Sequence, residues 1–250
     1  MIKYKQLNKN DITKSVKISN ILFEIYKDTC EFIRENINWK ISEHDILQFI
    51  LGKYNDYDLI SKKNPRIAFN ENNAKSSYVP SVNNSKIIRR SGLLSMTFMV
   101  SNKDSDNFGS LSKLVKINCP FNERQQACIN ALIDTEKSII GYLEEIIETN
   151  QKITGTDIHK KINEFLIKKN LSNYKLENSK LPIGKKTLNK INFDNSFSDN
   201  HLIMSPSILF IDPKIYFENF LFHNNINLIF SKNSINIITK DPYKVGNIQL

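Results

Sequence analysis

The sequence is poor in the residues that build disulfide frameworks, metal centres and phosphate loops. Its 250 residues include three cysteines, four histidines, seven glycines and seven prolines. The cysteines, Cys30, Cys119 and Cys128, leave one thiol over in any disulfide scheme and none stands at a metal-ligand spacing, so we expect reduced thiols in a cytoplasmic protein. No glycine-rich phosphate loop occurs, and no local Ser-His-Asp or Cys-His pattern of a hydrolase is present.

Long apolar runs are absent as well. No stretch approaches the roughly 18 consecutive apolar residues of a membrane span, and the N-terminal residues MIKYKQLNKND lack the apolar core of a signal peptide. A hydrophobic content of 40% with few glycines and prolines is nevertheless enough to bury a core. We therefore expect a folded, soluble protein that has no membrane partner.

Positive charge is the strongest bias of the composition. The formal net charge is +9, and a lysine-rich tract covers residues 160–190. Its lysines are Lys160, Lys161, Lys168, Lys169, Lys175, Lys180, Lys185, Lys186 and Lys190. Nucleic-acid binding through this tract is one hypothesis. Against it, aromatic residues do not alternate with the lysines, and Asn, Lys and Ile are abundant along the whole chain, which weakens any inference from charge alone.

One motif occurs twice. Residues 40–47 read KISEHDIL and residues 152–159 read KITGTDIH. Each combines Lys-Ile, a hydroxyl residue and, three positions later, Asp-Ile, which is typical of a capped helix start. Each also follows a long stretch of helical periodicity, so the repeat predicts two related halves.

The predicted helices come in two pairs. Apolar residues recur at helical spacing over residues 18–37, and Ser42 is expected to cap a second helix that runs to about residue 50. Pro120 and Asn122 open another long helix, and Thr156 is expected to cap the short helix after it. Trp39, between the first two helices, is expected to anchor their packing.

Short apolar runs between polar turns predict strands after each helix pair. The runs are RIAF, SYVPSV and KIIRRSGLLSMTFMV in the first half, and ILFIDPKIYF, NLIF and NIIT in the second. The sequence therefore predicts an α+β fold with an internal pseudo-twofold, in one domain over residues 1–250 with halves at about 15–118 and 119–240.

Several segments resemble one enzyme family in the same order. SILFIDPKIY resembles the MVFTIEPGIY-type segment of the methionine aminopeptidase and Xaa-Pro peptidase family, and RIAFNENNAKSSYVPS resembles its S-G-x-N-A-x-x-H-Y-x-P loop. Further similarities are found in RRSGLLSMTFMV, VKINCPFNERQ, LPIGKKTLNK and NLIFSKNSINIIT. The resemblance implies the creatinase-like pita-bread fold, in which two helix-helix-strand halves surround a curved antiparallel sheet.

Active members of that family hold two metal ions with two Asp, one His and two Glu, because carboxylates can bridge a pair of divalent cations. The resemblance places these ligands, in order, on Phe98, Ser110, Leu181, Asp212 and Asn225. Only Asp212 keeps a carboxylate. The histidines that assist the substrate fall on Ser77 and Leu188. The resemblance therefore implies a divergent member without metal or other cofactor.

The hypothesis drawn from these residues is a pseudopeptidase that binds a peptide, a partner protein or a small organic ligand in the vestigial cleft. The residues expected to line that cleft are Ser77, Tyr78, Phe98, Ser110, Leu181, Asp212 and Asn225. An alternative is an enzyme with metal-independent chemistry, in which Asp212 and His223 would be the catalytic pair. Nucleic-acid binding is the third hypothesis, and a homodimer is left open.

Overall fold

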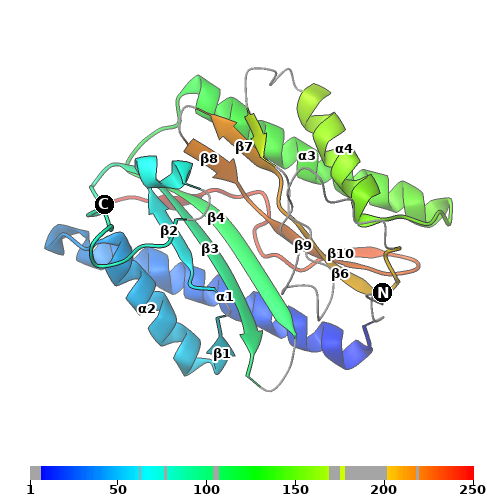
Figure 1. Ribbon diagram of the computed structural model, residues 1–250, viewed down its shortest axis with the longest axis horizontal. Coiled ribbons are helices and arrows are strands. Elements are labelled where there is room, and N and C mark those ends of the chain that lie inside the picture. Colours follow the sequence, from blue (N-terminus) through cyan, green and yellow to red (C-terminus); the bar gives the residue numbers. More distant parts are fainter. Residues whose placement is uncertain are drawn as a thin grey trace.

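The computed structural model describes residues 7–61, 63–75, 78–103, 107–168, 175–177, 202–217 and 220–250. Two long helices and two short ones pack on strands that lie between them (Figure 1). The helices are α1 (Lys9–Asn36), α2 (Glu43–Asp56), α3 (Glu123–Glu148) and α4 (Gly155–Lys168), with short 3-10 helices η1 (Ile37–Trp39) and η2 (Asn70–Ala74). Among the described residues, no helix is both long enough and apolar enough to span a membrane.

The duplicated motif forms the same structure in both halves. Ser42 and Thr154 each start the short helix, and Asp45 and Asp157 bond back to them, with carboxylate to backbone N–H distances of 2.7 and 2.9 Å. The reciprocal N–H to hydroxyl bonds are both 3.2 Å. This reciprocal pattern satisfies backbone donors that a helix start leaves unpaired.

The residue before each cap ties its helix start to the strand layer. The Ile41 carbonyl accepts the Ile88 N–H and the Ile153 carbonyl accepts the Ile203 N–H, both at 2.8 Å. Ser42 and Thr154 each also form an isolated antiparallel bridge, with Ile87 and Leu202. The two octapeptides are thus one structural unit used twice, which accounts for the repeat in the sequence.

The first half contributes the larger sheet. Its strands are β1 (Leu59–Ile60), β2 (Arg66–Phe69), β3 (Gly92–Asn102), β4 (Phe108–Ile117) and β11 (Gly246–Ile248). β1 and β2 both pair with β3, and β3 pairs with β4 over ten residue pairs, all antiparallel. The C-terminal β11 runs parallel to β4, so this sheet is mixed.

The second half adds two small antiparallel sheets. One has the order β10-β9-β6, from Ile235–Ile237, Ile226–Phe230 and Ser207–Ile211. The other has the order β5-β7-β8, from Lys175–Glu177, Lys214–Phe217 and Phe220–His223. Asp212 and Pro213 separate β6 from β7.

Strand alternation divides the core into two layers. Leu94, Met96 and Phe98 of β3 point into the cluster formed with α1 and α2. Leu93 of β3 and Leu114 of β4 belong to the other cluster, formed with α3, α4 and the second-half strands. The polar residues on the same side as Leu93 and Leu114 therefore lie between the two halves, where the site is found.

Three details differ from the sequence prediction. Thr154, not Thr156, caps α4. Tyr78 to Val82, within the predicted strand SYVPSV, is irregular, because Tyr78 is held by Glu43 and the chain turns at Val82. Trp39 is 80% exposed and so does not anchor the packing of α1 and α2, which is made by smaller buried side chains such as Ile33 and Ile46.

Candidate functional site

A network of hydroxyl and carboxamide side chains occupies the face of β3 and β4 between the two halves. We call Thr97, Ser110, Ser112, Asn225 and Asn227 the hydroxyl-amide network. The Asn225 Oδ1 accepts the Ser112 N–H at 2.5 Å, and its Nδ2 donates to Ser110 Oγ at 3.3 Å and to Asn227 Oδ1 at 3.2 Å. Asn227 in turn donates to the Ser110 carbonyl at 2.5 Å. Asn225 and Asn227 are almost fully buried, so these bonds satisfy groups that water cannot reach.

Thr97 completes this network from β3. It pairs with Ser112 in the β3–β4 register, and the two hydroxyl oxygens lie 3.4 Å apart. Because neighbouring residues on a strand face opposite sides, Thr97 points toward the network and Phe98 points away from it. The family resemblance placed the first aspartate ligand on Phe98, but the Phe98 side chain packs into the cluster with α1 and α2 and does not line this face.

A second polar group lies beside the network, formed by Ser95, Asp212, Lys214 and His223, which we call the acid-histidine group. The His223 Nδ1 is 3.4 Å from Asp212 Oδ1, and its Nε2 is 2.9 Å from Ser95 Oγ. Lys214 Nζ lies 3.5 Å from the other Asp212 oxygen. Ser95 and His223 are buried, at 1% and 3% exposure.

Charges in the acid-histidine group stabilise one another. Burial alone would raise the pKa of Asp212, but Lys214 and His223 outweigh it and hold the pKa below its ordinary value. Burial lowers the pKa of His223, and Asp212 opposes this only in part. Asp212 is therefore ionised and His223 neutral near pH 7, with the ring donating to Asp212 and accepting from Ser95.

Arg66 of β2 adds a cation to the same face. Its guanidinium donates to Ser95 Oγ at 3.2 Å and to the Asn73 carbonyl at 2.7 Å. Arg66 pairs with Thr97 in the β2–β3 register, so it borders both polar groups. The acid-histidine group is therefore in contact with two cationic side chains, Arg66 and Lys214.

Glu136 of α3 is a buried acid that sequence reasoning did not identify. It is fully buried, and its Oε1 accepts a 3.3 Å bond from Asn224. Burial raises its pKa well above the ordinary value, although Lys113 and Asn224 oppose the shift. Burial also lowers the pKa of Lys113 to about 8. Glu136 thus faces Lys113 and Asn224 from a fully buried position on α3.

The structure brings together only part of the cleft predicted from the sequence. Ser110 and Asn225 are in direct contact, and Asp212 lies in the neighbouring acid-histidine group. Tyr78 is elsewhere, because its hydroxyl donates to the buried Glu43 at 2.5 Å. Ser77 and Leu181 lie outside the described residues, as does Leu188.

Glu43 explains the position of Tyr78. This buried carboxylate of α2 accepts bonds from the Phe69 N–H at 2.5 Å, the Lys86 N–H at 2.8 Å and the Asn72 amide at 2.9 Å. Burial and the contact with Glu43 raise the pKa of Tyr78. Tyr78 is therefore part of a structural junction between α2, β2 and η2.

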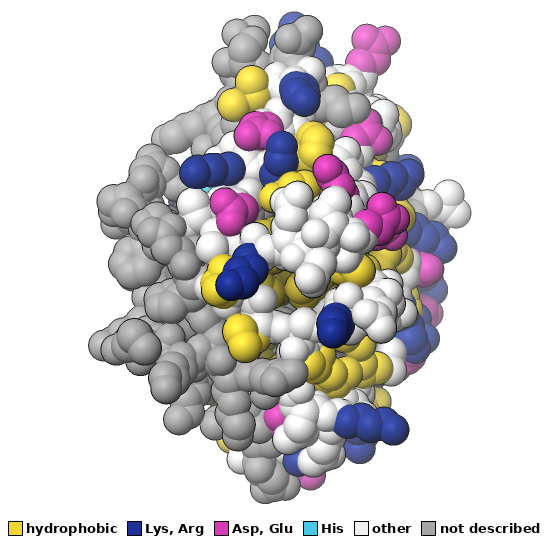
Figure 2. All heavy atoms as spheres, turned by 90° about the vertical axis from the view of Figure 1, so that its right-hand side faces the viewer, with side chains coloured by type: hydrophobic (Ala, Val, Ile, Leu, Met, Phe, Trp, Pro, Cys, Tyr) yellow, Lys and Arg dark blue, Asp and Glu magenta, His cyan; other side chains and the backbone are white. Residues whose placement is uncertain are grey.

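The lysine tract is described only at its start. Lys160 and Lys161 stand on α4, and Lys161 pairs with Glu164 at 2.8 Å. The side chains of the tract beyond Lys168 lie outside the described residues. On the face shown in Figure 2, Lys and Arg side chains are interspersed with Asp and Glu among the coloured atoms. This mixture gives no support to a nucleic-acid interface there.

The residues of the two polar groups do not fit a dinuclear metal centre. Divalent cations of that kind need several anionic or imidazole ligands around them. Thr97, Ser110 and Asn225 are neutral. Asn225 bonds to Ser110 and to the Ser112 N–H, and Thr97 bonds to the Ser112 hydroxyl. Within the described ranges, no three His, Cys, Asp or Glu side chains converge as metal ligands. No catalytic step through metal ions can be derived from these residues.

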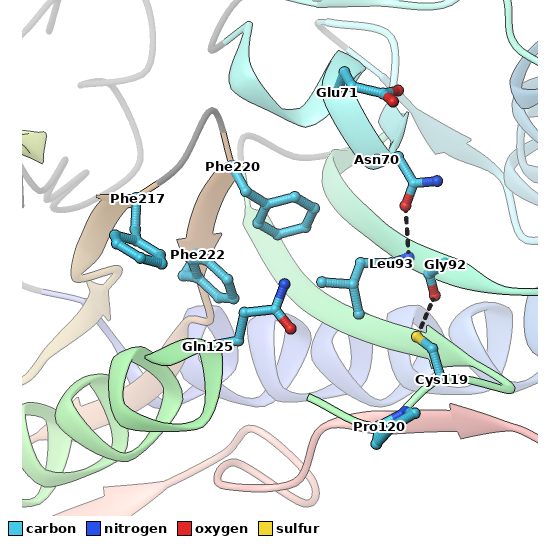
Figure 3. Close-up of a pocket in the computed structure, with 10 residues that line it drawn as sticks. All are labelled: Asn70, Glu71, Gly92, Leu93, Cys119, Pro120, Gln125, Phe217, Phe220 and Phe222. Atoms are coloured by element: carbon cyan, nitrogen blue, oxygen red, sulfur yellow. Dashed lines mark hydrogen bonds between the residues drawn. The ribbon is translucent and has the colours of Figure 1, made fainter. Parts of the chain in front are cut away.

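A pocket opens near the polar groups, where β3 begins. Its volume is about 380 Å³, and we call it the aromatic pocket. The lining residues are Asn70, Glu71, Gly92, Leu93, Cys119, Pro120, Gln125, Phe217, Phe220 and Phe222. Figure 3 shows the three phenylalanines of β7 and β8 on one side, with Leu93 and Gln125 facing them. The pocket adjoins the acid-histidine group, because Leu93 lies two residues before Ser95 and Phe222 directly precedes His223.

Comparison with known proteins identifies the fold. Neither a protein-family model nor a curated protein matches the sequence. Solved structures do match. An X-Pro aminopeptidase from Thermotoga maritima has a TM-score of 0.79 at 14% identity, covering 97% of this chain and 64% of that one. A prolidase from Thermococcus sibiricus has a TM-score of 0.77 at 12% identity, covering 98% and 62%.

A Xaa-Pro dipeptidase from Bacillus anthracis agrees, with a TM-score of 0.74 at 14% identity and coverage of 96% and 63%. The chain therefore has the pita-bread fold of the Xaa-Pro peptidases, which confirms the fold expected from the sequence resemblance. It spans less than two thirds of the length of these enzymes. At such identities the likeness establishes the fold alone.

Proposed function

We propose that this chain is a metal-free pseudopeptidase of the pita-bread fold, acting by binding a peptide, a partner protein or a small organic ligand. The hydroxyl-amide network carries this proposal. A metal centre that had only lost its ions would leave carboxylates in mutual repulsion, whereas here Asn225 bonds to Ser110 and Ser112, and Ser112 bonds to Thr97. These positions are built to be stable without cations.

Two further observations support a binding role. Ser95 and His223 are 1% and 3% exposed, so the most reactive pair of the site is closed to a substrate. The aromatic pocket beside it offers a concave surface on which apolar side chains stand next to polar ones such as Asn70 and Gln125, as in many ligand sites. All three cysteines are free thiols, which supports our placing the protein in the cytoplasm.

The test combines metal analysis with a peptidase assay. We expect purified protein to contain far less than one Mn, Co, Fe or Zn ion per chain, and to show no hydrolysis of Xaa-Pro dipeptides with or without added Mn²⁺. Mass spectrometry of the native protein would identify any ligand that co-purifies. One or two bound metal ions per chain, or metal-dependent turnover, would contradict the proposal.

The second candidate is metal-independent catalysis by the acid-histidine group. The contacts of 2.9 and 3.4 Å from Ser95 through His223 to Asp212 have the order of a nucleophile, a base and an orienting acid. Asp212→Asn would then reduce turnover by roughly 10²-fold or more while the thermal melt stays nearly unchanged. Labelling of wild type, but not of Ser95→Ala, by a fluorophosphonate probe would favour this candidate. Absence of labelling would leave the binding role.

A further inference from the structure

The aromatic pocket is held in shape by bonds of its own. The Asn70 Oδ1 accepts the Leu93 N–H at 2.9 Å, and the Cys119 thiol donates to the Gly92 carbonyl at 3.1 Å (Figure 3). A side chain at Gly92 would place its Cβ 2.5 Å from the Phe69 ring, so only glycine permits this approach. A pocket fixed in this way does not have to be ordered by its ligand.

One wall of the pocket is apolar and aromatic. Phe220 and Phe222 pack with ring centroids 4.7 Å apart, and Phe217 is paired with Phe220 in the antiparallel register of β7 and β8. Leu93 lies opposite these rings (Figure 3). Such a wall gains most from a ligand group that is itself aromatic or large and aliphatic.

The charge around the pocket is balanced. Among the described residues Glu71 is the one charged side chain of the lining, and its carboxylate pairs with Lys86. In the part of the chain that the structure describes, no lysine, arginine or histidine lines the pocket. A phosphate or nucleotide would therefore find no partner, and an unpaired cation would compete with Lys86 for Glu71. The pocket suits an uncharged group.

Gln125 supplies a directed hydrogen-bond donor. Its Oε1 accepts the Asn122 N–H at 3.1 Å in the cap of α3, which fixes the orientation of the carboxamide. Its nitrogen points toward Phe220 (Figure 3). A ligand that fills the pocket must offer an acceptor oxygen there, as a peptide carbonyl does.

Resting on the proposed binding function, we propose that the aromatic pocket receives an aromatic or large aliphatic side chain of a peptide segment, whose backbone carbonyl accepts from Gln125. The volume of about 380 Å³ lies at the lower end for ligand sites, so it accommodates one or two residues and not a large cofactor. The segment would bind next to the acid-histidine group without entering it.

The test uses N-acetyl-phenylalanine amide as the probe, followed by NMR titration of the whole chain. We expect shifts at Leu93 and Phe222, with N-acetyl-glycine amide and N-acetyl-lysine amide at least about tenfold weaker. Gln125→Leu should weaken binding about fivefold or more, since it removes the donor and keeps the bulk. Its matched control is Gln126→Leu, which alters the next, exposed glutamine and should bind as wild type does.

Phe220→Ala provides an independent test, with at least a tenfold loss of affinity expected in protein shown by circular dichroism to be folded. Equal binding of the glycine and phenylalanine probes would overturn the proposal, as would an unchanged affinity in Gln125→Leu. Benzamide that binds as tightly as the peptide probe would also overturn it, in favour of a small-molecule site. Protein that binds no probe, yet is metal-free and inactive on Xaa-Pro dipeptides, would reject this inference and leave the pseudopeptidase proposal standing.

Discussion

Replacing Asn225 by aspartate restores a carboxylate to the hydroxyl-amide network while hardly changing its shape. The new side chain loses the donors to Ser110 Oγ and Asn227 Oδ1, which lie at 3.3 and 3.2 Å. Two lost bonds cost about 1 kcal/mol each, and the oxygen that replaces the nitrogen then faces the Asn227 oxygen. Since residue 225 is only 2% exposed, desolvation of the new negative charge further lowers the stability of the folded state.

We therefore expect Asn225→Asp to lower the free energy of unfolding by about 3 kcal/mol at pH 7.5, or the melting temperature by roughly 6–12 °C. Burial raises the pKa of the new acid above the value of about 3.9 in the unfolded chain. The folded state then binds the proton more tightly, so the loss of stability is complete above the raised pKa and shrinks as pH falls toward 4.

The assay is thermal unfolding of wild type and variant at pH 7.5 and 4.5, each with and without Mn²⁺. Asn130→Asp, at an exposed position of α3, controls for the added charge and should melt within about 0.5 kcal/mol of wild type. An unchanged melt of Asn225→Asp at pH 7.5 would refute the reasoning about burial. Stabilisation of the variant by Mn²⁺ would show that enough metal ligands remain, and would refute the conclusion that these residues do not fit a metal centre.

Three other predictions concern stability. Glu43→Ala should lower the free energy of unfolding in urea by about 3–5 kcal/mol, because it leaves four hydrogen-bond donors without their acceptor, those of Phe69, Asn72, Tyr78 and Lys86. Asp45→Ala, which affects only the start of α2, should lower it by about 1 kcal/mol. Ser42→Ala and Thr154→Ala should each cost about 1 kcal/mol, and clearly unequal losses would argue against equivalent caps. The pKa of His223 is lowered by burial, so the folded protein binds a proton less tightly than the unfolded chain, and stability is lost as pH falls through about 6.5. His223→Gln should reduce the stability difference between pH 7.5 and 5.5, and an unchanged difference would mean that other groups cause it.

Sequence patterns predicted correctly those features that depend on residues close together in the chain, such as helix starts. Asn122 caps α3 and Ser42 caps α2 as predicted, because both depend on residues three positions apart. The resemblance to the Xaa-Pro peptidases predicted the fold, which structural comparison confirmed. Two errors came from one- or two-residue shifts. Thr154, not Thr156, caps α4. Phe98, expected to line the cleft, packs on the opposite face of β3 from Thr97, since a shift of one residue on a strand reverses the face.

The remaining features depend on contacts between distant segments. The aromatic pocket combines residues from η2, β3, the start of α3 and the β7–β8 hairpin, and no local pattern connects Gln125 with Phe220. In the sequence, Glu136 looks like any acidic residue of an amphipathic helix. Its burial depends on the distant segment that contains Asn224, whose amide donates to its carboxyl group. The alternation of Phe220 and Phe222 on one strand face was a usable signal for the pocket wall. The pairing of Phe217 with Phe220, which completes this wall, could not be predicted from the alternation alone.

The exposed position of Trp39 has a practical consequence for spectroscopy. It is the single tryptophan of the chain, and 80% of its surface is in contact with solvent. Its emission should already be red-shifted and open to quenching by iodide in the folded protein, so unfolding will change it little. Folding of this chain is better followed by circular dichroism. Trp39 fluorescence therefore reports on the surroundings of η1. A blue shift of its emission on adding a binding partner would indicate a contact at η1.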